Sequence, residues 1–162
     1  MTEPPCVIRD GRLPQDEILF AGFIDALQAY ERAFEPDRRV DPRAGADYLP
    51  VLFKRVAEHD GCIFVAELAG RPVGWAVFHC LEGPVYLEPA ERRAGLVAEL
   101  YLEEAARGRG LGKALLQACE AAARARGLKR LQIGVHSGNA RARQAYTAAG
   151  FAPYMQELRK YL

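Results

Sequence analysis

A glycine-rich turn immediately before a helical pattern is the strongest chemical feature of the sequence. Its residues are Arg107, Gly108, Arg109, Gly110, Leu111, Gly112 and Lys113. Glycines let a large anion approach the main chain without meeting side chains, and the start of a helix offers unpaired N–H groups with a partial positive charge. The turn therefore predicts a phosphate cradle. The charge at the helix end contributes only about 0.3–1 kcal/mol, so several N–H hydrogen bonds, helped by Arg107, Arg109 or Lys113, must share the binding.

Two widespread phosphate-binding patterns do not fit this turn. A Walker loop needs a glycine five residues before its Gly-Lys pair and Ser or Thr after it, but those positions hold Arg107 and Ala114. A dinucleotide fingerprint needs a third glycine three residues after the second, where the sequence has Lys113 or Leu115. The turn therefore indicates a different phosphate-containing ligand.

A second group of candidate residues follows the apolar run at residues 131–135, which predicts a buried strand. Asn139 ends the next turn and is a good helix cap. One face of the helix that follows is shared by Ala142, Ala145, Tyr146 and Ala149. Tyr146 is thus expected to point inward, where a tyrosine is usually part of the core with its hydroxyl hydrogen-bonded at the edge.

The rest of the chain predicts the elements that hold these residues. Short apolar runs alternate with helical patterns, which indicates an α/β domain. We expect strands at residues 6–9, 62–67, 73–80, 97–102 and 131–135, the second and third forming an antiparallel hairpin. We expect helices to begin near Pro14, Asp47, Leu111 and Asn139.

Composition limits the class of protein. The chain has 162 residues, 50% hydrophobic and 27% charged, which suits one globular domain. The net charge of +1 argues against bulk attraction to nucleic acid or to an anionic membrane. No run of about 18 apolar residues occurs and the first six residues lack a basic region, so neither a membrane span nor a signal peptide is expected.

The cysteines and histidines do not predict a metal or redox site. Cys6, Cys62, Cys80 and Cys119 are too far apart for the paired spacings of zinc or redox motifs, and we expect each to be a buried apolar residue. The three histidines are also widely separated, so no metal is expected. These features favour a cytoplasmic location.

The order of strand, Arg-x-x-Gly-x-Gly turn and helix resembles the GNAT superfamily of acyl-CoA-dependent N-acyltransferases. The resemblance covers residues 62–158, from the hairpin through the strand Glu99, Leu100, Tyr101 and Leu102 and the glycine turn to residues 139–146 and the closing Gly150 and Phe151. Leu102 stands where the family often has valine, a change that should keep a backbone contact intact. The N-terminal helices fit the more variable, substrate-facing region of the family.

The resemblance implies a fold and a binding site. The fold is a single domain over residues 1–162 with a mixed, mostly antiparallel central sheet flanked by helices. Backbone groups of Leu100, Tyr101 and Leu102 would pair with the pantetheine arm and the acetyl carbonyl of acetyl-CoA, often where a bulge splays this strand from the next. Residues 107–113 would bind the diphosphate. Asn139 would contact the same cosubstrate or serve only as a cap.

The chemistry of acetyl transfer assigns two further roles. An amine that attacks a thioester must lose a proton, and the departing thiolate must gain one. The resemblance implies that Tyr146 supplies the second proton, because in the family this position commonly does so. A phenol with a pKa of about 10 can act in this way when it is well positioned. Glu99, directly or through a water, is the candidate base, although a solvated or ion-paired glutamate is the ordinary alternative. Strand alternation puts Glu99 and Tyr101 on one face and Leu100 and Leu102 on the other.

The sequence therefore predicts an N-acetyltransferase that moves an acetyl group from acetyl-CoA directly to a primary amine. No metal and no covalent acetyl-enzyme are expected, because no cysteine lies in a nucleophile arrangement with histidine. A non-catalytic acyl-CoA-binding or sensing module is the alternative. The acceptor is a small-molecule or peptide amine, with small amines, amino acids, peptide N-termini, lysine side chains and aminoglycosides all open. No nucleic-acid or membrane partner is expected, and the resemblance leaves a homodimer open.

Overall fold

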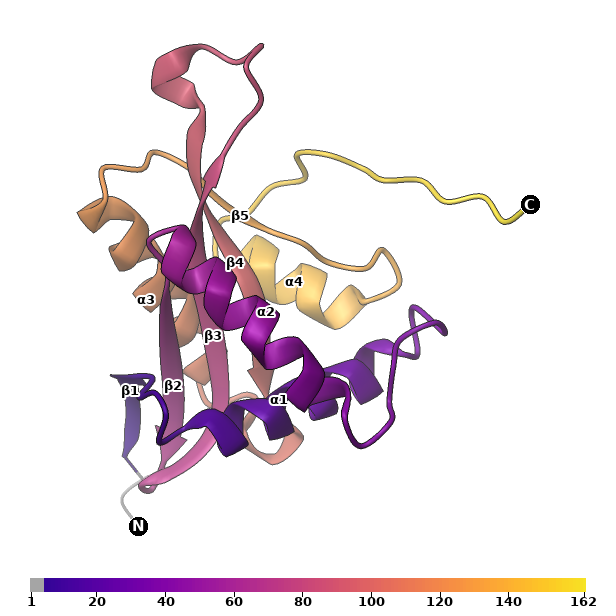
Figure 1. Ribbon diagram of the computed structural model, residues 1–162. Helices are drawn as coiled ribbons and strands as arrows, with labels where there is room; N and C mark the ends of the chain where they lie inside the picture. Colours follow the sequence, from indigo (N-terminus) through magenta and orange to yellow (C-terminus); the bar gives the residue numbers. More distant parts are fainter. Residues whose placement is uncertain (1–4) are drawn as a thin grey trace.

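A mixed sheet lies at the centre of the protein, shown in Figure 1 as a computed structural model that describes residues 5–162. Its strands are β1 (Cys6–Asp10), β2 (Cys62–Leu68), β3 (Arg71–Glu82), β4 (Arg93–Leu102) and β5 (Leu131–Ile133), and their order across the sheet is their order in the chain. The first four pair antiparallel, and β5 runs parallel to β4. The predicted mixed, mostly antiparallel sheet is confirmed. Residues 1–4, on which part of the signal-peptide expectation rests, lie outside the described residues.

Helices cover both faces of this sheet. Helices α1 (Glu17–Glu31) and α2 (Ala44–Glu58) cross in front of it in Figure 1, whereas α3 (Leu111–Ala125) packs on the opposite face against β1 to β4. Helix α4 (Ala140–Ala148) follows β5, and short 3-10 turns occupy Pro89–Glu91 and Glu104–Ala106. No helix formed by residues 5–162 has the length and apolar character needed to span a bilayer.

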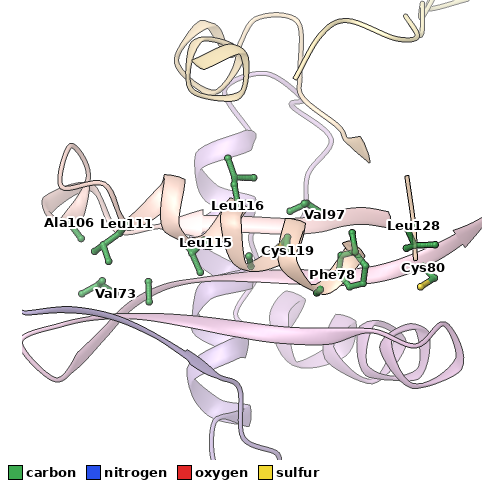
Figure 2. Packing of buried hydrophobic residues seen from close by; sticks show 14 residues of the cluster. Val73, Phe78, Cys80, Val97, Ala106, Leu111, Leu115, Leu116, Cys119 and Leu128 are labelled. Carbon is green, nitrogen blue, oxygen red and sulfur yellow. The ribbon is translucent and has the colours of Figure 1, made fainter. Parts of the chain in front are cut away.

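Two apolar clusters, one on each face, hold the layers together. Figure 2 shows the first cluster, in which Leu115 and Cys119 of α3 are fully buried against Phe78 of β3. The second cluster joins α1 and α2 to the other face, where the ring of Phe20 stacks on Trp75 with centroids 5.0 Å apart. Trp75 is fully buried, as expected of a core residue.

Strand β4 changes its pairing where the sequence predicts chemistry. Val77 of β3 pairs with Glu99 but Phe78 pairs with Val97, so β4 carries one extra residue, Ala98, at a bulge. Strand β5 pairs with β4 only from Gly95 to Val97. Residues 98–102 thus have no strand partner on the β5 side within the described sheet. This is the predicted splaying of the two strands.

Several predicted boundaries were wrong. Helix α2 begins at Ala44 rather than at Asp47, because the N–H of Gly45 donates to Asp25 Oδ1 at 2.7 Å and no local side-chain cap is needed. Strand β4 begins at residue 93 rather than 97, and β5 ends at residue 133 rather than 135. The expectation of four buried cysteines fails for Cys6, which is exposed on edge strand β1, and for Cys62, which is half-buried.

A buried histidine gives a testable pH dependence of stability. The side chain of His79 is 2% exposed, its Nδ1 lies 2.9 Å from the Cys80 carbonyl oxygen, and its Nε2 has no hydrogen-bond partner among residues 5–162. Burial, with smaller contributions from His59 and Arg55, lowers the pKa of His79. The unfolded chain therefore binds a proton at this residue below pH about 6.5 that the folded protein does not.

We predict that the free energy of unfolding decreases as the pH falls below about 6.5, with a slope from this residue of at most about 1.4 kcal/mol per pH unit. His79→Gln should remove that slope between pH 7.5 and 5.5. Urea denaturation at several pH values measures it, and His59→Gln, at the exposed neighbouring histidine, is the matched control that should keep it. Equal slopes in wild type and His79→Gln would contradict the assignment.

Candidate functional site

The predicted phosphate cradle is a run of backbone N–H groups that have no acceptor among residues 5–162. The N–H groups of residues 108–113 donate no hydrogen bond within residues 5–162, and the first bond of α3 runs from Ala114 N to Gly110 O at 3.0 Å. Gly108 and Gly110 have φ values of +76° and +79°, a region that glycine enters without strain. These two residues turn the chain so that successive N–H groups face the same end of the helix.

Open space surrounds the turn. A Cβ atom placed on Gly108, Gly110 or Gly112 would meet no atom within 4 Å. Arg109 and Lys113 are exposed on either side of Gly112. The positive end of the α3 dipole, the unpaired N–H groups and the nearby cations together make a site suited to a diphosphate.

Arg107 has a more structural position than Arg109 or Lys113. Its Nε donates to the Leu102 carbonyl oxygen at 2.9 Å, and its guanidinium carbon lies 5.1 Å from the centre of the Tyr30 ring. The arginine thus connects the end of β4, the glycine turn and α1. The Leu102 carbonyl, expected from the resemblance to pair with the pantetheine arm, accepts the Arg107 bond in this structure.

The faces predicted for β4 are confirmed. Leu100 and Leu102 pack on the α3 side of the sheet, whereas Tyr101 packs on the α1 and α2 side. The ring of Tyr101 lies 5.7 Å from that of Phe23, and burial raises the pKa of its phenol. The backbone of residues 100–102 lies on the stretch of β4 that has separated from β5.

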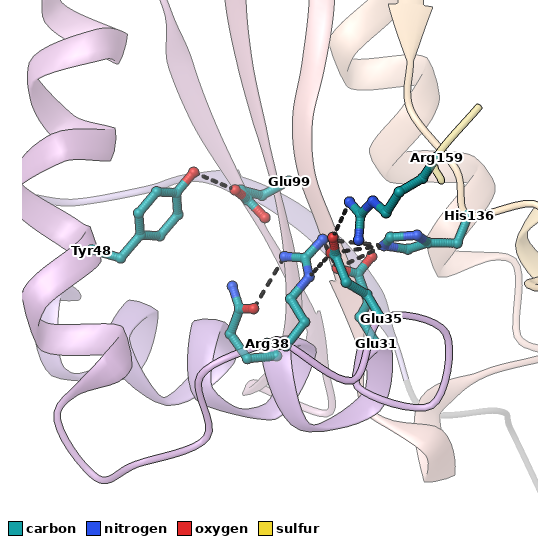
Figure 3. A network of polar contacts seen from close by, with 8 residues as sticks. Glu31, Glu35, Arg38, Tyr48, Glu99, His136 and Arg159 are labelled. Carbon is teal, nitrogen blue, oxygen red and sulfur yellow. Dashed lines mark hydrogen bonds and ion pairs between the residues drawn. The ribbon is translucent and has the colours of Figure 1, made fainter. Parts of the chain in front are cut away.

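Glu99 is a half-buried carboxylate held by one hydrogen bond. The hydroxyl of Tyr48 donates to Glu99 Oε1 at 2.7 Å (Figure 3). Burial raises the pKa of Glu99, and the negative charge of Glu31 raises it further. The Tyr48 bond and the positive charges of Arg38 and Arg55 oppose this shift. Such a carboxylate is a stronger base than an exposed one.

A network of ion pairs lies beside Glu99. Arg38 contacts Glu35 at 2.7 Å and Glu31 at 2.8 Å, and its guanidinium also lies 3.2 Å from His136 Nε2. Arg159, from the C-terminal segment, reaches the other oxygen of Glu35 at 2.8 Å (Figure 3). Arg38 is thus the centre of a junction between α1, the α1–α2 loop and the turn before α4.

Tyr146 lies on α4 and faces the interior as predicted. It packs against the first cluster, and its ring centre is 6.1 Å from that of Phe151. Burial, with smaller contributions from Glu31 and Tyr30, raises the pKa of Tyr146 to about 12. The negative charge of Glu31, at the C-terminal end of α1, contributes to the raised pKa of both Glu99 and Tyr146.

Asn139 caps α4, as the sequence predicts. Its Oδ1 accepts from the N–H of Ala142 at 3.1 Å and from the hydroxyl of Tyr30 at 3.3 Å. The side chain is 6% exposed. Because Tyr30 also lies under Arg107, this asparagine ties α4 to the helix that supports the glycine turn.

An open cavity of about 320 Å³ lies at helix α2, with Tyr48 in its lining. It is lined by Gln28 of α1, Arg39 of the following loop, and Ala44, Asp47, Tyr48 and Val51 of α2. Tyr48 thus both lines the cavity and donates to Glu99. Tyr48 was not predicted as a site residue. It precedes Leu52 by four residues and so lies on the same face of α2, but no local pattern links it to a glutamate 51 residues away.

Within the described residues, no cluster of three or more His, Cys, Asp or Glu side chains is placed to bind a metal.

Comparisons with known proteins agree with this fold. Residues 23–151 match the acetyltransferase (GNAT) family. No curated protein matches the sequence. A tetramutant of the BH1408 protein from Bacillus halodurans has a similar structure, with a TM-score of 0.80 and 20% identity over 96% of this chain and 99% of that chain.

Two further similar structures contain a coenzyme. A predicted acetyltransferase from Clostridium acetobutylicum, with acetyl-CoA, has a TM-score of 0.74 and 18% identity over 97% of this chain and 96% of that chain. The aminoglycoside N-acetyltransferase AAC(6')-Iy, in complex with CoA, has a TM-score of 0.70 and 16% identity over 99% of this chain and 97% of that chain. At these identities the likeness establishes the fold.

We predict that Asn139→Ala lowers the free energy of unfolding by about 1–2 kcal/mol, because the α4 cap and the bond from Tyr30 are both lost. Asn139→Asp keeps an oxygen acceptor at the start of the helix and is the matched control, which should lose less stability. Urea denaturation at neutral pH measures both variants. Equal losses would show that the cap oxygen does not stabilise α4.

Proposed function

Because the chain belongs to the GNAT acetyltransferase family, we propose that it transfers an acetyl group from acetyl-CoA directly to a primary amine. The observation that carries the proposal is the run of unpaired N–H groups at residues 108–113, which opens helix α3. This site lies directly after the stretch of β4 that has separated from β5. A phosphate cradle beside a free strand edge suits a long ligand with a diphosphate at one end and an amide-containing arm at the other.

The residues present fit coenzyme A, which would supply the acetyl group as an activated thioester. The N–H groups of residues 108–113 would hold the diphosphate, with Arg109 and Lys113 adding charge. The edge of residues 98–102 would offer main-chain groups to the pantetheine arm. Asn139 is engaged by Ala142 and Tyr30, which favours the cap over the cosubstrate contact as its main role.

Two side chains would manage the protons of the transfer. Glu99 would accept a proton from the acceptor's ammonium group, which frees the nitrogen lone pair to form the new C–N bond. Tyr146 would donate its proton to the sulfur as the C–S bond breaks. After the C–N bond has formed, the nitrogen would lose a second proton, which would return to Tyr146 through solvent. The proton that Glu99 accepted would be released to solvent once per turnover. A phenol with a pKa of about 12 remains protonated at neutral pH, as a donor must.

The acceptor is proposed to be a small molecule that enters the cavity beside Tyr48. The cavity volume of about 320 Å³ suits a small ligand or one part of a larger one. Two similar structures are of an aminoglycoside acetyltransferase from an uncultured soil sample, one of them in complex with sisomicin. These relatives support a small polyamine-like acceptor.

An amine panel tests the proposal. Acetyl-CoA should bind in calorimetry, and its thiol should be released when tobramycin, spermidine, an amino-acid amide or a lysine-containing peptide is added. Mass spectrometry of the product should show one added acetyl group on nitrogen. Binding of acetyl-CoA without acceptor-dependent thiol release would contradict the enzyme and indicate a binding or sensing module.

We predict that Gly112→Leu weakens acetyl-CoA binding at least about tenfold, equivalent to about 1.4 kcal/mol, and leaves the fold intact. The new side chain would enter space that is open in the protein but needed for the diphosphate. Gly22→Leu is the matched control, because Gly22 is an exposed helical glycine that also has open space at its Cβ position. Calorimetric titration and thermal melting measure the two effects. Wild-type affinity in Gly112→Leu would argue against the cradle.

We predict that Tyr146→Phe lowers kcat by roughly 10²–10⁴-fold and leaves acetyl-CoA affinity within twofold of wild type. The variant keeps the ring that packs near Phe151 and removes only the proton donor. Thiol release in the presence of the best amine of the panel gives kcat, and calorimetry gives affinity. Tyr86→Phe, at an exposed tyrosine, should behave as wild type. Unchanged kcat would remove Tyr146 from the mechanism.

A further inference from the structure

We propose that Tyr48 is a positioning residue for Glu99: its hydroxyl fixes Oε1 of the carboxylate and leaves Oε2 to take the proton of the acceptor amine. This inference rests on the proposed function, because it assumes that Glu99 is the base. The bond from Tyr48 to Oε1 is 2.7 Å long, and no other hydrogen bond to this carboxylate is found within residues 5–162. Tyr48 belongs to α2, in the part of the chain that carries no motif of the transfer reaction.

The backbone that carries Tyr48 is held firmly against α1. The N–H of Gly45 donates to Asp25 at 2.7 Å, and a Cβ atom on Gly45 would lie 2.4 Å from the Ala21 carbonyl oxygen. Only glycine permits this close approach of the two helices. Leu49, the next residue after Tyr48, is buried in the second cluster. The tyrosine is thus fixed on both sides before it reaches Glu99.

Tyr48 also contacts the place proposed for the acceptor. Its side chain lines the cavity together with Asp47 and Gln28, while its hydroxyl reaches across to β4. A molecule in the cavity would therefore contact the residue that orients the base. This arrangement distinguishes Tyr48 from a tyrosine that only fills space between a helix and a sheet.

The surrounding charges define what loss of the hydroxyl should do. Glu99 is faced by Glu31 from α1, Arg38 from the following loop, and Arg55 and Tyr48 from α2. Burial and Glu31 favour the protonated carboxyl, while the Tyr48 bond and the two arginines favour the carboxylate. Removing the hydroxyl leaves the opposing charges in place. The carboxyl should then release its proton only at a higher pH.

The test compares wild type, Tyr48→Phe, Glu99→Gln and Tyr86→Phe. Protein labelled with ¹³C at the glutamate carboxyl carbons is titrated by NMR, and the signal missing from Glu99→Gln identifies Glu99. In Tyr48→Phe the midpoint of this signal should rise by about one pH unit. The acidic limb of kcat/KM for the best amine of the panel should rise equally. Activity at low pH should fall about tenfold and recover at high pH, with acetyl-CoA affinity unchanged; Tyr86→Phe should match wild type throughout.

The outcomes separate this inference from the proposed function. An unchanged NMR midpoint in Tyr48→Phe overturns the positioning role, as does a loss of activity that is equal at all pH values. If Glu99→Gln keeps full turnover, Glu99 is not the base. If no amine of the panel is acetylated, the proposed acetyl transfer is wrong. In either case the inference about Tyr48 fails as well. Loss of turnover in Glu99→Gln with a wild-type pH profile in Tyr48→Phe overturns the inference alone.

Discussion

The main constraint on this protein is that consecutive backbone N–H groups at the start of α3 find no acceptor in the described chain. In water such groups are hydrogen-bonded by solvent, so the free protein tolerates them. A ligand that covers them must replace those bonds, and an anion does so best because its charge also meets the positive end of the helix dipole. Burial of Leu111 and Leu115 fixes the helix on the sheet, so the direction of the N–H groups is set by the core.

Strand β4 connects this cradle to Glu99, the proposed base. Along its whole length it pairs with β3, but it leaves β5 after Val97 and carries a bulge at Ala98. The bulge shifts the alternation of the strand by one residue, so that Glu99 and Tyr101 face α1 and α2 while Leu102 packs on the α3 side. One strand therefore supplies a free main-chain edge, a half-buried carboxylate and the entry to the glycine turn. The free edge exists because β5 ends its pairing at Val97.

Local patterns in the sequence predicted those elements whose stabilising contacts are themselves local or periodic. The buried apolar face of α3, the β2–β3 hairpin and the Asn139 cap are examples. The turn at Gly108 and Gly110 was predictable because glycine adopts positive φ values without strain. The start of α2 was misplaced because its first turn is satisfied by Asp25, a residue of another helix. The bond between Tyr48 and Glu99 was not predictable for the same reason. Its partners meet only after α2 has packed on the sheet.

The α1–α2 unit thus does more than cover one face of the sheet, because it sets the proton affinity of the groups on β4 and α4. A glutamate in water, with a pKa of about 4.3, is a weak base toward an ammonium group, and burial of Glu99 strengthens it. Burial favours the neutral, protonated carboxyl, a form that cannot act as a base. The Tyr48 bond, Arg38 and Arg55 oppose this effect, whereas Glu31 adds to it and also contributes, after burial, to the raised pKa of Tyr146. Under the proposed function, residues that tune the acid and the base therefore lie in the same part of the chain that lines the cavity.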